Sequence, residues 1–380
     1  MDFNISEEQC MIQQTARDFA RDKIEPLAAR LDENREFPVD LVRELGELGF
    51  MGVTVNPKWG GAGMDPICYA LAVEEISRAC ASTGVIMSAH NSLVCDPLEA
   101  YGTDEQKEKY LTPLASGKKL GAHGLTEPSA GSDVGGLKTR AVLDGDEWVL
   151  NGSKIFITNG AYADIILVFA STDPEQKARG ISAFIVEKEM PGFKVGSREK
   201  TMGIRASCTS ELIFEDLRIP KKNMLGELNR GFKIAMVTLN GGRIGIAAQA
   251  VGIARSALEK AIEYSKNRQQ FNQPISNFQA IQWMLADMAT ETDAARLLTL
   301  RAAYLKMHGK SYATEAAQAK LFASRTAMRV ADRAIQIHGG YGFSTEYHVE
   351  RHLRDAKITE LYEGTSEIQR IVIARSLLAD

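Results

Sequence analysis

Residues 147–158, EWVLNGSKIFIT, decide the fold, because they are rich in β-branched and aromatic side chains within a chain that is otherwise patterned as helices. Two similar runs follow, DIILVFAS at 164–171 and GISAFIVEKE at 180–189, and Gly, Asn, Asp and Pro residues separate them. We therefore expect a small β domain over residues 118–225.

Helical patterns occupy both sides of this β region. Residues 1–117 include EEQCMIQQTARDFARDKIEPLAARL (7–31), where apolar residues recur every three or four positions, and a Gly- and Pro-rich stretch at 56–66 interrupts the pattern. Residues 226–380 include two longer helical patterns, at 242–268 and 278–307, and such lengths are typical of bundles of antiparallel helices. The chain thus divides into three expected domains, at 1–117, 118–225 and 226–380.

The composition is that of an ordinary globular protein without a basic field. Hydrophobic residues make up 44 % and charged residues 25 % of the 380 positions, and the net charge is -4. Such a chain has no electrostatic attraction for nucleic acid or for an anionic membrane, so we expect neither partner. No apolar run approaches the roughly 20 residues that span a bilayer.

The cysteines and the first residues bear on the compartment. The five cysteines are scattered and form no C-x-x-C pair: Cys10, Cys68, Cys80, Cys95 and Cys208. This argues against a disulfide framework or a zinc site and for a reducing compartment. The start, MDFNISEEQC, lacks a secretory signal and is too acidic for a transit peptide. We expect a cytoplasmic protein, with a processed mitochondrial matrix form as the alternative.

The stretch ITELYEGTSEIQR (358–370) places three carboxylates, those of Glu360, Glu363 and Glu367, around one glycine. Ser366 followed three residues later by Gln369 fits a capping box, which predicts that a helix begins near Thr365 or Ser366. The preceding stretch, HVERHLRDAKITELY, is predicted to be another helix. A turn is therefore expected between the two helices.

Tyr362, Glu363 and Gly364 occupy this predicted turn. The helix that follows offers unpaired N–H groups and the positive end of its dipole, which stabilise a polarised oxygen. A potential base would then stand beside potential oxyanion donors. By pattern alone, the commoner interpretation is that Glu363 is a solvated glutamate near a helix end.

Four further segments could carry chemistry, although each has an ordinary structural interpretation when taken alone: GLTEPSAGSDVGG (124–136), KIFITNG (154–160), NRQQF (267–271) and QIHGGYGF (336–343). The first is a loop whose backbone amides can approach a ligand, but it is neither a Rossmann fingerprint nor a Walker loop. The last two are typical of helix C-termini. His348 and His352 lie four apart on a predicted helix, yet no histidine has metal-site spacing, so no metal is expected.

Taken together and in this order, these segments resemble the acyl-CoA dehydrogenase family over essentially the whole chain, and most closely its short-chain, butyryl-CoA type. The motifs that carry the resemblance are GLTEPSAGSD (124–133), WVLNGSKIFITNG (148–160), GGRIGIAAQAVGIA (241–254), QIHGGYGF (336–343) and RDAKITELYEGTSEIQR (354–370). The resemblance implies a mainly α fold with a central β domain. An N-terminal helical domain, a middle β-barrel-like domain and a C-terminal four-helix bundle would assemble as a homotetramer.

The resemblance also implies that FAD lies between the β domain and the bundle. By motif match, the residues on the flavin and substrate side are Leu125, Thr126, Ser132, Phe156, Ile157 and Thr158. The residues that match contacts offered to FAD in a neighbouring protomer are Arg268, Phe271, Gln279, Gln336, Gly339 and Gly340. Thr365 and Glu367 would complete the site.

In the family's mechanism, the glutamate of the Y-E-G-T turn, here Glu363, removes the α-proton of an acyl-CoA while the β-hydrogen leaves as hydride to the flavin. The backbone N–H of Glu363 and an FAD ribityl hydroxyl stabilise the enolate. Shielding from water would raise the pKa of the base toward neutrality. The implied substrate contacts are Ser132, Asn240, Arg243, Tyr362 and Gly364, and the implied redox partner is an electron-transfer flavoprotein.

Departures from the family pattern narrow the subtype. Isovaleryl-type and long-chain members carry the base just before the arginine that matches Arg243, where this chain has Gly242, so the base is not relocated. Short-chain relatives usually have Asp at the position of Asn240, which puts a charged contact to CoA in doubt. Glutaryl-type enzymes use an arginine near the substrate tail, whereas residues 79–100 contain no Arg or Lys. Burying the unpaired distal carboxylate of such a substrate beside these residues would cost about 3 kcal/mol or more.

Several alternatives stay open at this point. Residues 79–100 contain His90, Asn91 and Asp96, which are expected to lie on a helix surface or in bundle hydrogen bonds, with a modified or cyclic acyl group as the alternative. A branched acyl group also stays open as the substrate. A flavin-dependent oxidase or monooxygenase, or a non-catalytic binding factor, could share the scaffold. The intact turn with Glu363 argues against the monooxygenase and the binding factor. Acyl chain length, oxygen reactivity and membership of an electron-bifurcating complex are not readable from the sequence.

Overall fold

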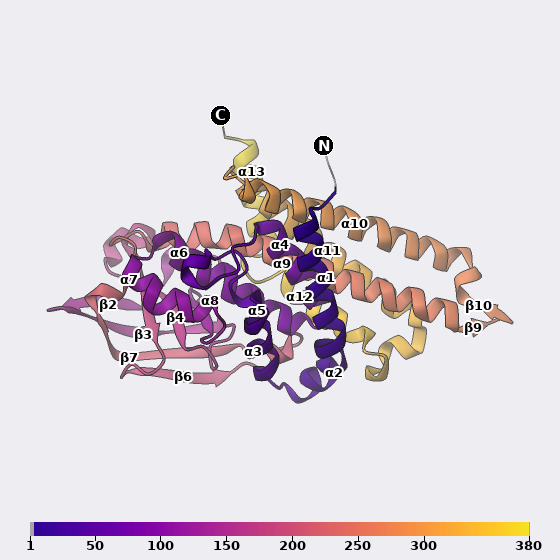
Figure 1. Cartoon of the computed structure of the whole chain (residues 1–380), viewed down its shortest axis with the longest axis horizontal. Coiled ribbons are helices and arrows are strands. Elements are labelled where there is room, and N and C mark those ends of the chain that lie inside the picture. Colours follow the sequence, from indigo (N-terminus) through magenta and orange to yellow (C-terminus); the bar gives the residue numbers. More distant parts are fainter. Residues whose placement is uncertain (1–3, 380) are drawn as a thin grey trace.

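The computed structural model describes residues 4–379 and has a mainly α fold with a central sheet, as predicted (Figure 1). The N-terminal helices are α1 Glu7–Phe19, α2 Glu25–Asn34, α3 Val39–Glu47, α4 Pro66–Ala79, α5 Ala81–His90, α6 Asp96–Tyr101, α7 Asp104–Gln106 and α8 Thr112–Ala115. Helix α1 begins with a capping box, in which the Ser6 hydroxyl accepts from the Gln9 N–H and the Gln9 side chain accepts from the Ser6 N–H.

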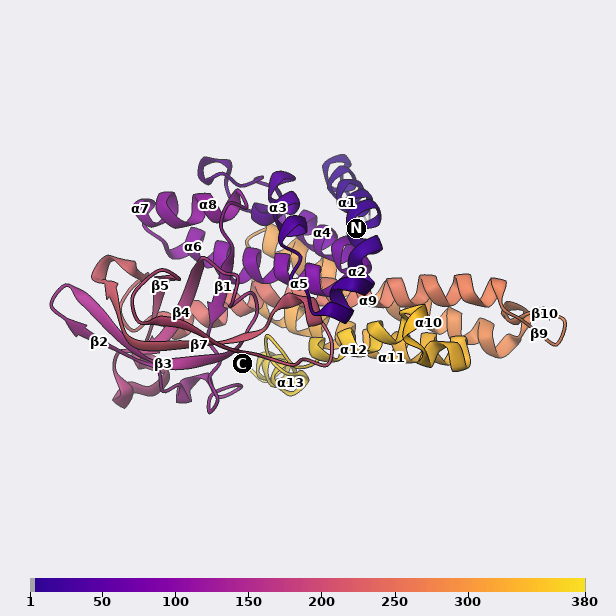
Figure 2. The same cartoon turned by 90° about the horizontal axis from the view of Figure 1, so that it is seen from below.

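The sheet follows these helices in the chain. Its strands are β1 Gly121–Gly124, β2 Arg140–Asp144, β3 Glu147–Ile157, β4 Ile165–Ser171, β5 Ile181–Glu187, β6 Phe193–Arg198, β7 Ser210–Pro220 and β8 Met224–Leu225. The strand order is β6-β7-β3-β2-β4-β5-β8, and β1 pairs in parallel with β4. Of the N-terminal helices, α6, α7 and α8 lie along one side of this sheet, whereas α1 and α2 lie over the C-terminal helices (Figure 2). Strand β4 is buried along its whole length because both of its faces are covered.

Long helices form the C-terminal part, with a short hairpin between the first two of them. They are α9 Gly231–Asn267, α10 Gln279–Met307, α11 Ala313–His338, α12 Val349–Thr359 and α13 Ser366–Leu377, and the hairpin strands are β9 Gln269–Gln270 and β10 Gln273–Pro274. Helix α9 runs from the sheet to the far end of the molecule, where the hairpin lies (Figures 1 and 2).

Helix α9 is the centre of the helical core. Its middle part is apolar on nearly every side, and residues from Ile244 to Ala257 are almost all buried, as expected for a helix surrounded by others. Small residues let α4 approach closely: a Cβ on Gly252 would stand 2.4 Å from the carbonyl oxygen of Glu74. The core thereby fixes α9 between the N-terminal helices and the rest of the C-terminal helices.

One helix prediction needs correction. His348 lies before α12 in a left-handed conformation (φ 57°), and α12 begins at Val349, so His348 and His352 do not share a helix. His352 is buried and its Nε2 lies 3.3 Å from the Ser256 hydroxyl of α9. Within residues 4–379, no helix is long and apolar enough to cross a membrane.

Candidate active site

A cavity of about 180 Å³ lies where α5, α9, the sheet and the turn before α13 meet. The predicted residues that line it are Leu125, Thr126, Ser132, Phe156, Ile157, Thr158, Arg243, Tyr362, Glu363 and Gly364. Apolar side chains of α5 and α9 also line it, namely Val85, Ala89, Met236 and Leu239, and the other lining residues are Leu93, His123, Gly131, Val134 and Ile368. We call this cavity the Glu363 pocket. The fold therefore brings together residues that lie more than 200 positions apart in the chain.

The turn that carries Glu363 is strained and well supported. Glu363 and Gly364 both have left-handed φ values, of 52° and 98°. The predicted cap was Thr365 or Ser366, and Thr365 is the residue that caps α13, since its hydroxyl accepts from the Ile368 N–H at 3.4 Å. Ser366 is already inside the helix. The Gln369 side chain does not complete a capping box, because its amide donates to the Gly364 carbonyl at 2.7 Å.

The Glu363 carboxylate is held in an unusual environment. Burial raises its pKa to about 7, and the charges of Lys320 and Arg243 oppose that rise. Its Oε2 atom is buried and has no hydrogen-bond partner among the residues that the structure describes. Gly242 lies directly against it, since a Cβ there would stand 2.0 Å from Oε2. A carboxyl with a pKa near neutrality and a free oxygen is suited to act as a base.

Arg243 and Asn240 lie on the same face of α9. Arg243 lines the Glu363 pocket and is only 5 % exposed, and its Nη1 donates to Asn240 Oδ1 at 2.8 Å. Burial lowers the pKa of Arg243, while the nearby carboxylate of Glu363 acts in the opposite direction. Asn240 itself does not line the cavity; it orients the arginine.

Tyr362 fixes the other side of the turn. Its hydroxyl donates to the Gln249 side chain of α9, and the Gln249 amide donates to the Ala81 carbonyl at 2.9 Å. Burial raises the pKa of the Tyr362 hydroxyl well above its ordinary value, so this group stays protonated. Gln249 was not singled out in the sequence, where it is one polar residue in an apolar helix.

Two buried charged residues, Lys154 and Glu127, anchor the loop after β1. Neither was singled out in the sequence. Lys154 Nζ donates to Glu127 Oε1 at 2.6 Å and to the Leu125 carbonyl at 3.1 Å. The same carboxylate accepts from the backbone N–H groups of Lys138 and Thr139. This network holds the loop that carries Leu125, Thr126 and Ser132 against β3.

Six other predicted cofactor residues lie far from the Glu363 pocket, whereas Thr365 and Glu367 directly follow its turn. Arg268, Gly339 and Gly340 line a separate cavity at the hairpin end of the helices, where Phe271 is 87 % exposed and Gln279 and Gln336 are exposed. Arg243 and Arg268 are 25 positions apart on one continuous helix, which corresponds to about 38 Å. Glu367 is exposed and pairs with Arg370 at 3.3 Å.

The polar residues of 79–100 turn away from the pocket. His90 accepts from the Gly121 N–H through Nδ1 and its Nε2 contacts the Leu114 carbonyl, while the Asn91 amide bonds the Phe50 and Met87 carbonyls. Asp96 pairs with Lys306 at 2.5 Å. Burial lowers the pKa of His90 to about 4. Of the two expected interpretations, a helix surface or bundle hydrogen bonds, the surface is wrong for His90 and Asn91, which are buried, and all three side chains are held by hydrogen bonds or an ion pair.

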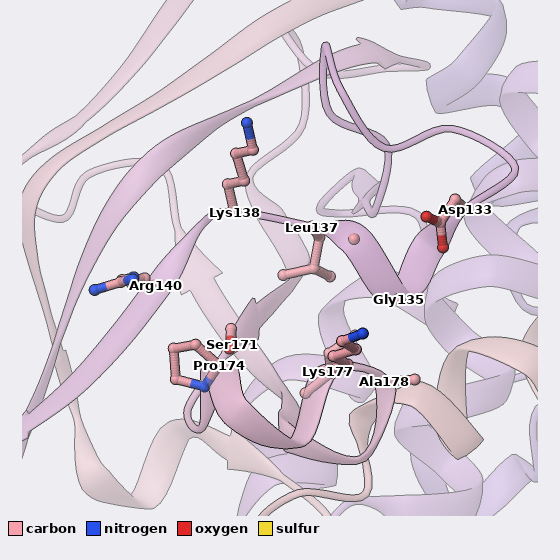
Figure 3. Close-up of a pocket in the computed structure, with 11 residues that line it drawn as sticks. Asp133, Gly135, Leu137, Lys138, Arg140, Ser171, Pro174, Lys177 and Ala178 are labelled. Carbon is pink, nitrogen blue, oxygen red and sulfur yellow. The ribbon is translucent and has the colours of Figure 1, made fainter.

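A second cavity, of about 790 Å³, lies on the other side of the loop at 131–138. Asp133, Gly135 and Leu137 line it, together with the basic side chains of Lys138, Arg140 and Lys177. Figure 3 shows that these three cationic groups point in different directions rather than toward one another. They do not converge on a single point, in contrast to the groups around Glu363.

Comparison with known proteins agrees with this arrangement. The chain matches the models of the acyl-CoA dehydrogenase N-terminal domain over residues 6–118, middle domain over 122–217 and C-terminal domain over 229–378. "Acyl-CoA dehydrogenase, short-chain specific" from Clostridium acetobutylicum is 52 % identical over 98 % of this chain and 99 % of that protein.

Two solved structures are similar over their full lengths. Butyryl-CoA dehydrogenase from Megasphaera elsdenii has a TM-score of 0.99 and 50 % identity, covering 100 % of both chains. A chain in a structure described as "Electron transferring flavoprotein of Acidaminococcus fermentans" has a TM-score of 0.99 and 53 % identity, also covering 100 % of both chains. The resemblance seen in the sequence is confirmed, and the chain belongs to the acyl-CoA dehydrogenase family.

Proposed function

We propose that this protein is an FAD-dependent dehydrogenase that converts a short-chain acyl-CoA thioester into the trans-2-enoyl-CoA. The observation that carries the proposal is Glu363, a buried carboxylate with a free oxygen and a pKa of about 7 at the wall of an otherwise largely apolar pocket. The full-length similarity to short-chain and butyryl-CoA enzymes supports the substrate class.

The residues around the pocket fit FAD, the cofactor of this family. Phe156 has a left-handed backbone and an exposed ring (59 %), which leaves an aromatic face free at the end of β3. Thr126, Ser132 and Thr158 offer hydroxyls beside it. We assign these residues, with Leu125 and Ile157, to the flavin side. When bound, FAD accepts the hydride that leaves the β-carbon of the substrate.

The proposed chemistry of the chain itself is a proton transfer. The Glu363 carboxylate takes the α-proton of the thioester and becomes a neutral acid, and the electron pair of the broken C–H bond enters the new Cα–Cβ double bond. The Glu363 backbone N–H has no acceptor among the residues that the structure describes, so it is free to donate to the thioester oxygen. Positive φ at Gly364 lets the turn approach the thioester without a side chain in the way.

The pocket favours a short aliphatic acyl group. One side of the pocket is formed by α5 and the turn that follows it. The side chains there carry no charge: Val85, Ala89 and Leu93. A distal carboxylate would lack a cationic partner there, because burial lowers the pKa of His123, which lines the pocket beside Leu93, to about 4 and its ring is therefore neutral at pH 7. We propose Arg243, Tyr362 and Gly364 as substrate contacts together with Ser132, and Asn240 as the residue that orients Arg243.

The distant set of predicted residues supports an assembly of several protomers. Arg268 lies about 38 Å from Arg243 along α9, and Gly339 and Gly340 line the same cavity as Arg268, so these residues cannot serve the same FAD molecule as Glu363. We propose that they, with Phe271, Gln279 and Gln336, contact FAD in a neighbouring protomer of a homotetramer, and that Thr365 and Glu367 complete the site.

The electron acceptor is an electron-transfer flavoprotein, as the similarity to the chain from the Acidaminococcus fermentans structure supports. We also propose a cytoplasmic location. The five cysteines are free and four of them are buried, which suits a reducing compartment.

Anaerobic titration with acyl-CoA esters from C4 to C8, including branched and cyclic ones, tests this function. We expect butyryl-CoA to bleach the flavin of the purified protein most completely, with weaker bleaching by longer esters. If no ester bleaches the flavin, the dehydrogenase assignment is wrong. If only a branched or cyclic ester does, the short straight-chain assignment is wrong.

The pH dependence of kcat/KM is expected to report Glu363. Below its pKa of about 7 the carboxyl is protonated and cannot accept the α-proton, so kcat/KM should fall about tenfold for each pH unit below 7. Initial rates with butyryl-CoA and an excess of electron acceptor measure this acidic limb of the pH profile. A midpoint near 4.5, the ordinary value of the group, would show that burial does not shift Glu363.

Gly242→Ala is expected to lower kcat by about tenfold or more, because the new Cβ would stand 2.0 Å from Glu363 Oε2 and must displace the carboxylate. Gly241→Ala is the matched control, since its Cβ would meet side-chain atoms of Lys306, Asp96 and Tyr312 at 3.3, 3.5 and 3.9 Å, and none of these residues lines the Glu363 pocket. Similar kcat values for the two variants would contradict the placement of the base against Gly242.

A further inference from the structure

We infer that Lys320 is a positioning residue for the base: its buried ammonium ties the two ends of the turn that carries Glu363 and places a positive charge on the α11 side of the carboxylate. The inference rests on the proposed function and assigns a role to a residue outside the Glu363 pocket.

The contacts of Lys320 are specific. It lies on α11, is 1 % exposed, and shares its helix face with the buried Ala316, Ala319 and Ala323. Its Nζ donates to the carbonyl of Thr359, the last residue of α12, at 3.0 Å, and to the carbonyl of Gly364, the last residue of the turn, at 2.7 Å. One ammonium thus bridges the residues before and after positions 360–363. A cation at the C-terminus of α12 also complements the helix dipole.

Packing alone does not explain a lysine at this position. Burying an ammonium costs several kcal/mol, whereas an apolar side chain such as Met would fill an alanine-lined face without that cost. The Gly364 carbonyl also accepts from the Gln369 amide at 2.7 Å, so it keeps a partner without Lys320. The charge is what an apolar residue could not supply.

The electrostatic surroundings show what the charge acts on. Glu363 is faced by Lys320 from α11 and by Arg243 from α9, and these cations oppose the rise in pKa that burial causes. Lys320 is in turn faced by Glu363, Arg243, Glu360 and Glu367, and burial lowers its own pKa to about 7. Of the two cations, Lys320 has the larger effect on the pKa of Glu363. Removing it therefore leaves a smaller fraction of the base ionised at neutral pH.

The test is the pH profile of kcat/KM for the FAD-loaded protein with butyryl-CoA. We expect Lys320→Met to move the midpoint of the acidic limb upward by about one pH unit. Lys320→Gln is neutral and keeps an N–H donor on a slightly shorter side chain, and it should show the same shift if the Met variant does not fold. Lys357→Met removes an equal charge from an exposed site on α12, where Lys357 pairs with Glu360 at 2.7 Å, and should leave the midpoint unchanged.

Gln369→Leu separates charge from hydrogen bonding. It removes the other donor to Gly364 without changing any charge, so it should lower kcat while leaving the midpoint in place. Neutral Lys320 variants that fold, retain FAD and keep the wild-type midpoint would overturn the inference, as would an equal shift in Gln369→Leu. Failure of the proposed function is distinguishable, because it would appear as a wild-type protein that butyryl-CoA does not bleach.

Discussion

Glu363→Gln is expected to retain FAD and to slow bleaching of the flavin by butyryl-CoA more than ~100-fold, the usual lower limit for loss of a general base. Glutamine has the shape of glutamate, so the turn and its contacts with Lys320 and Gln369 should persist. Its amide, however, cannot accept the α-proton. Anaerobic stopped-flow mixing measures the rate, and the flavin absorbance of the purified variant measures cofactor content.

Glu360→Gln is the matched control within the same stretch of sequence. Glu360 directly follows α12, pairs with Lys357 at 2.7 Å, and is not one of the residues that line the Glu363 pocket. This variant should bleach at close to the wild-type rate. Bleaching of Glu363→Gln at a similar rate would place the base elsewhere, and the structure leaves no substitute in residues 79–100, because His90 and Asp96 are engaged outside the pocket.

Lys154→Met is expected to destabilise the protein by about 3–5 kcal/mol, because it leaves the Glu127 carboxylate buried without its cation. The two side chains are 0 % and 3 % exposed and their charged atoms are 2.6 Å apart, so solvent cannot replace the lost partner. The loop that carries Thr126 and Ser132 should loosen with it, which predicts weaker FAD binding. The free energy of unfolding in urea and the dissociation constant of FAD are the measurements.

The double variant Glu127→Gln, Lys154→Met isolates the cost of the unpaired charge. Because it buries no lone carboxylate, it should recover a large part of the stability that Lys154→Met loses. A single Lys154→Met variant as stable as the wild type would show that backbone N–H groups from Lys138 and Thr139 suffice for Glu127.

Helix and strand regions were predictable because their patterns are local. The apolar repeat of 242–268 lies within α9 except for its last residue, and the β-rich run at 147–158 nearly coincides with β3. The pairing of β1 with β4 was not predictable in the same way, since it joins strands 40 residues apart through contacts that no local pattern records. The cap at Thr365 was predicted to within one residue, and only the geometry of the turn separates it from Ser366.

The chemistry of Glu363 could not be predicted from its own stretch. Its environment is made by Gly242 and Arg243 on α9 and by Lys320 on α11, which lie far from it in the chain. Lys320 could have been noticed in the sequence, because it falls on the same helix face as several alanines. A face of small apolar residues indicates burial, and a lysine is unusual there. Glu127 and Lys154 left none, since each is an ordinary charged residue within a loop or strand pattern.

The most direct test of the whole account is one anaerobic mixing of the FAD-loaded protein with a single equivalent of butyryl-CoA, followed by analysis of the thioester. We predict loss of the oxidised flavin absorbance together with formation of an equal amount of the trans-2-enoyl-CoA. Unchanged flavin absorbance with butyryl-CoA recovered intact would contradict it.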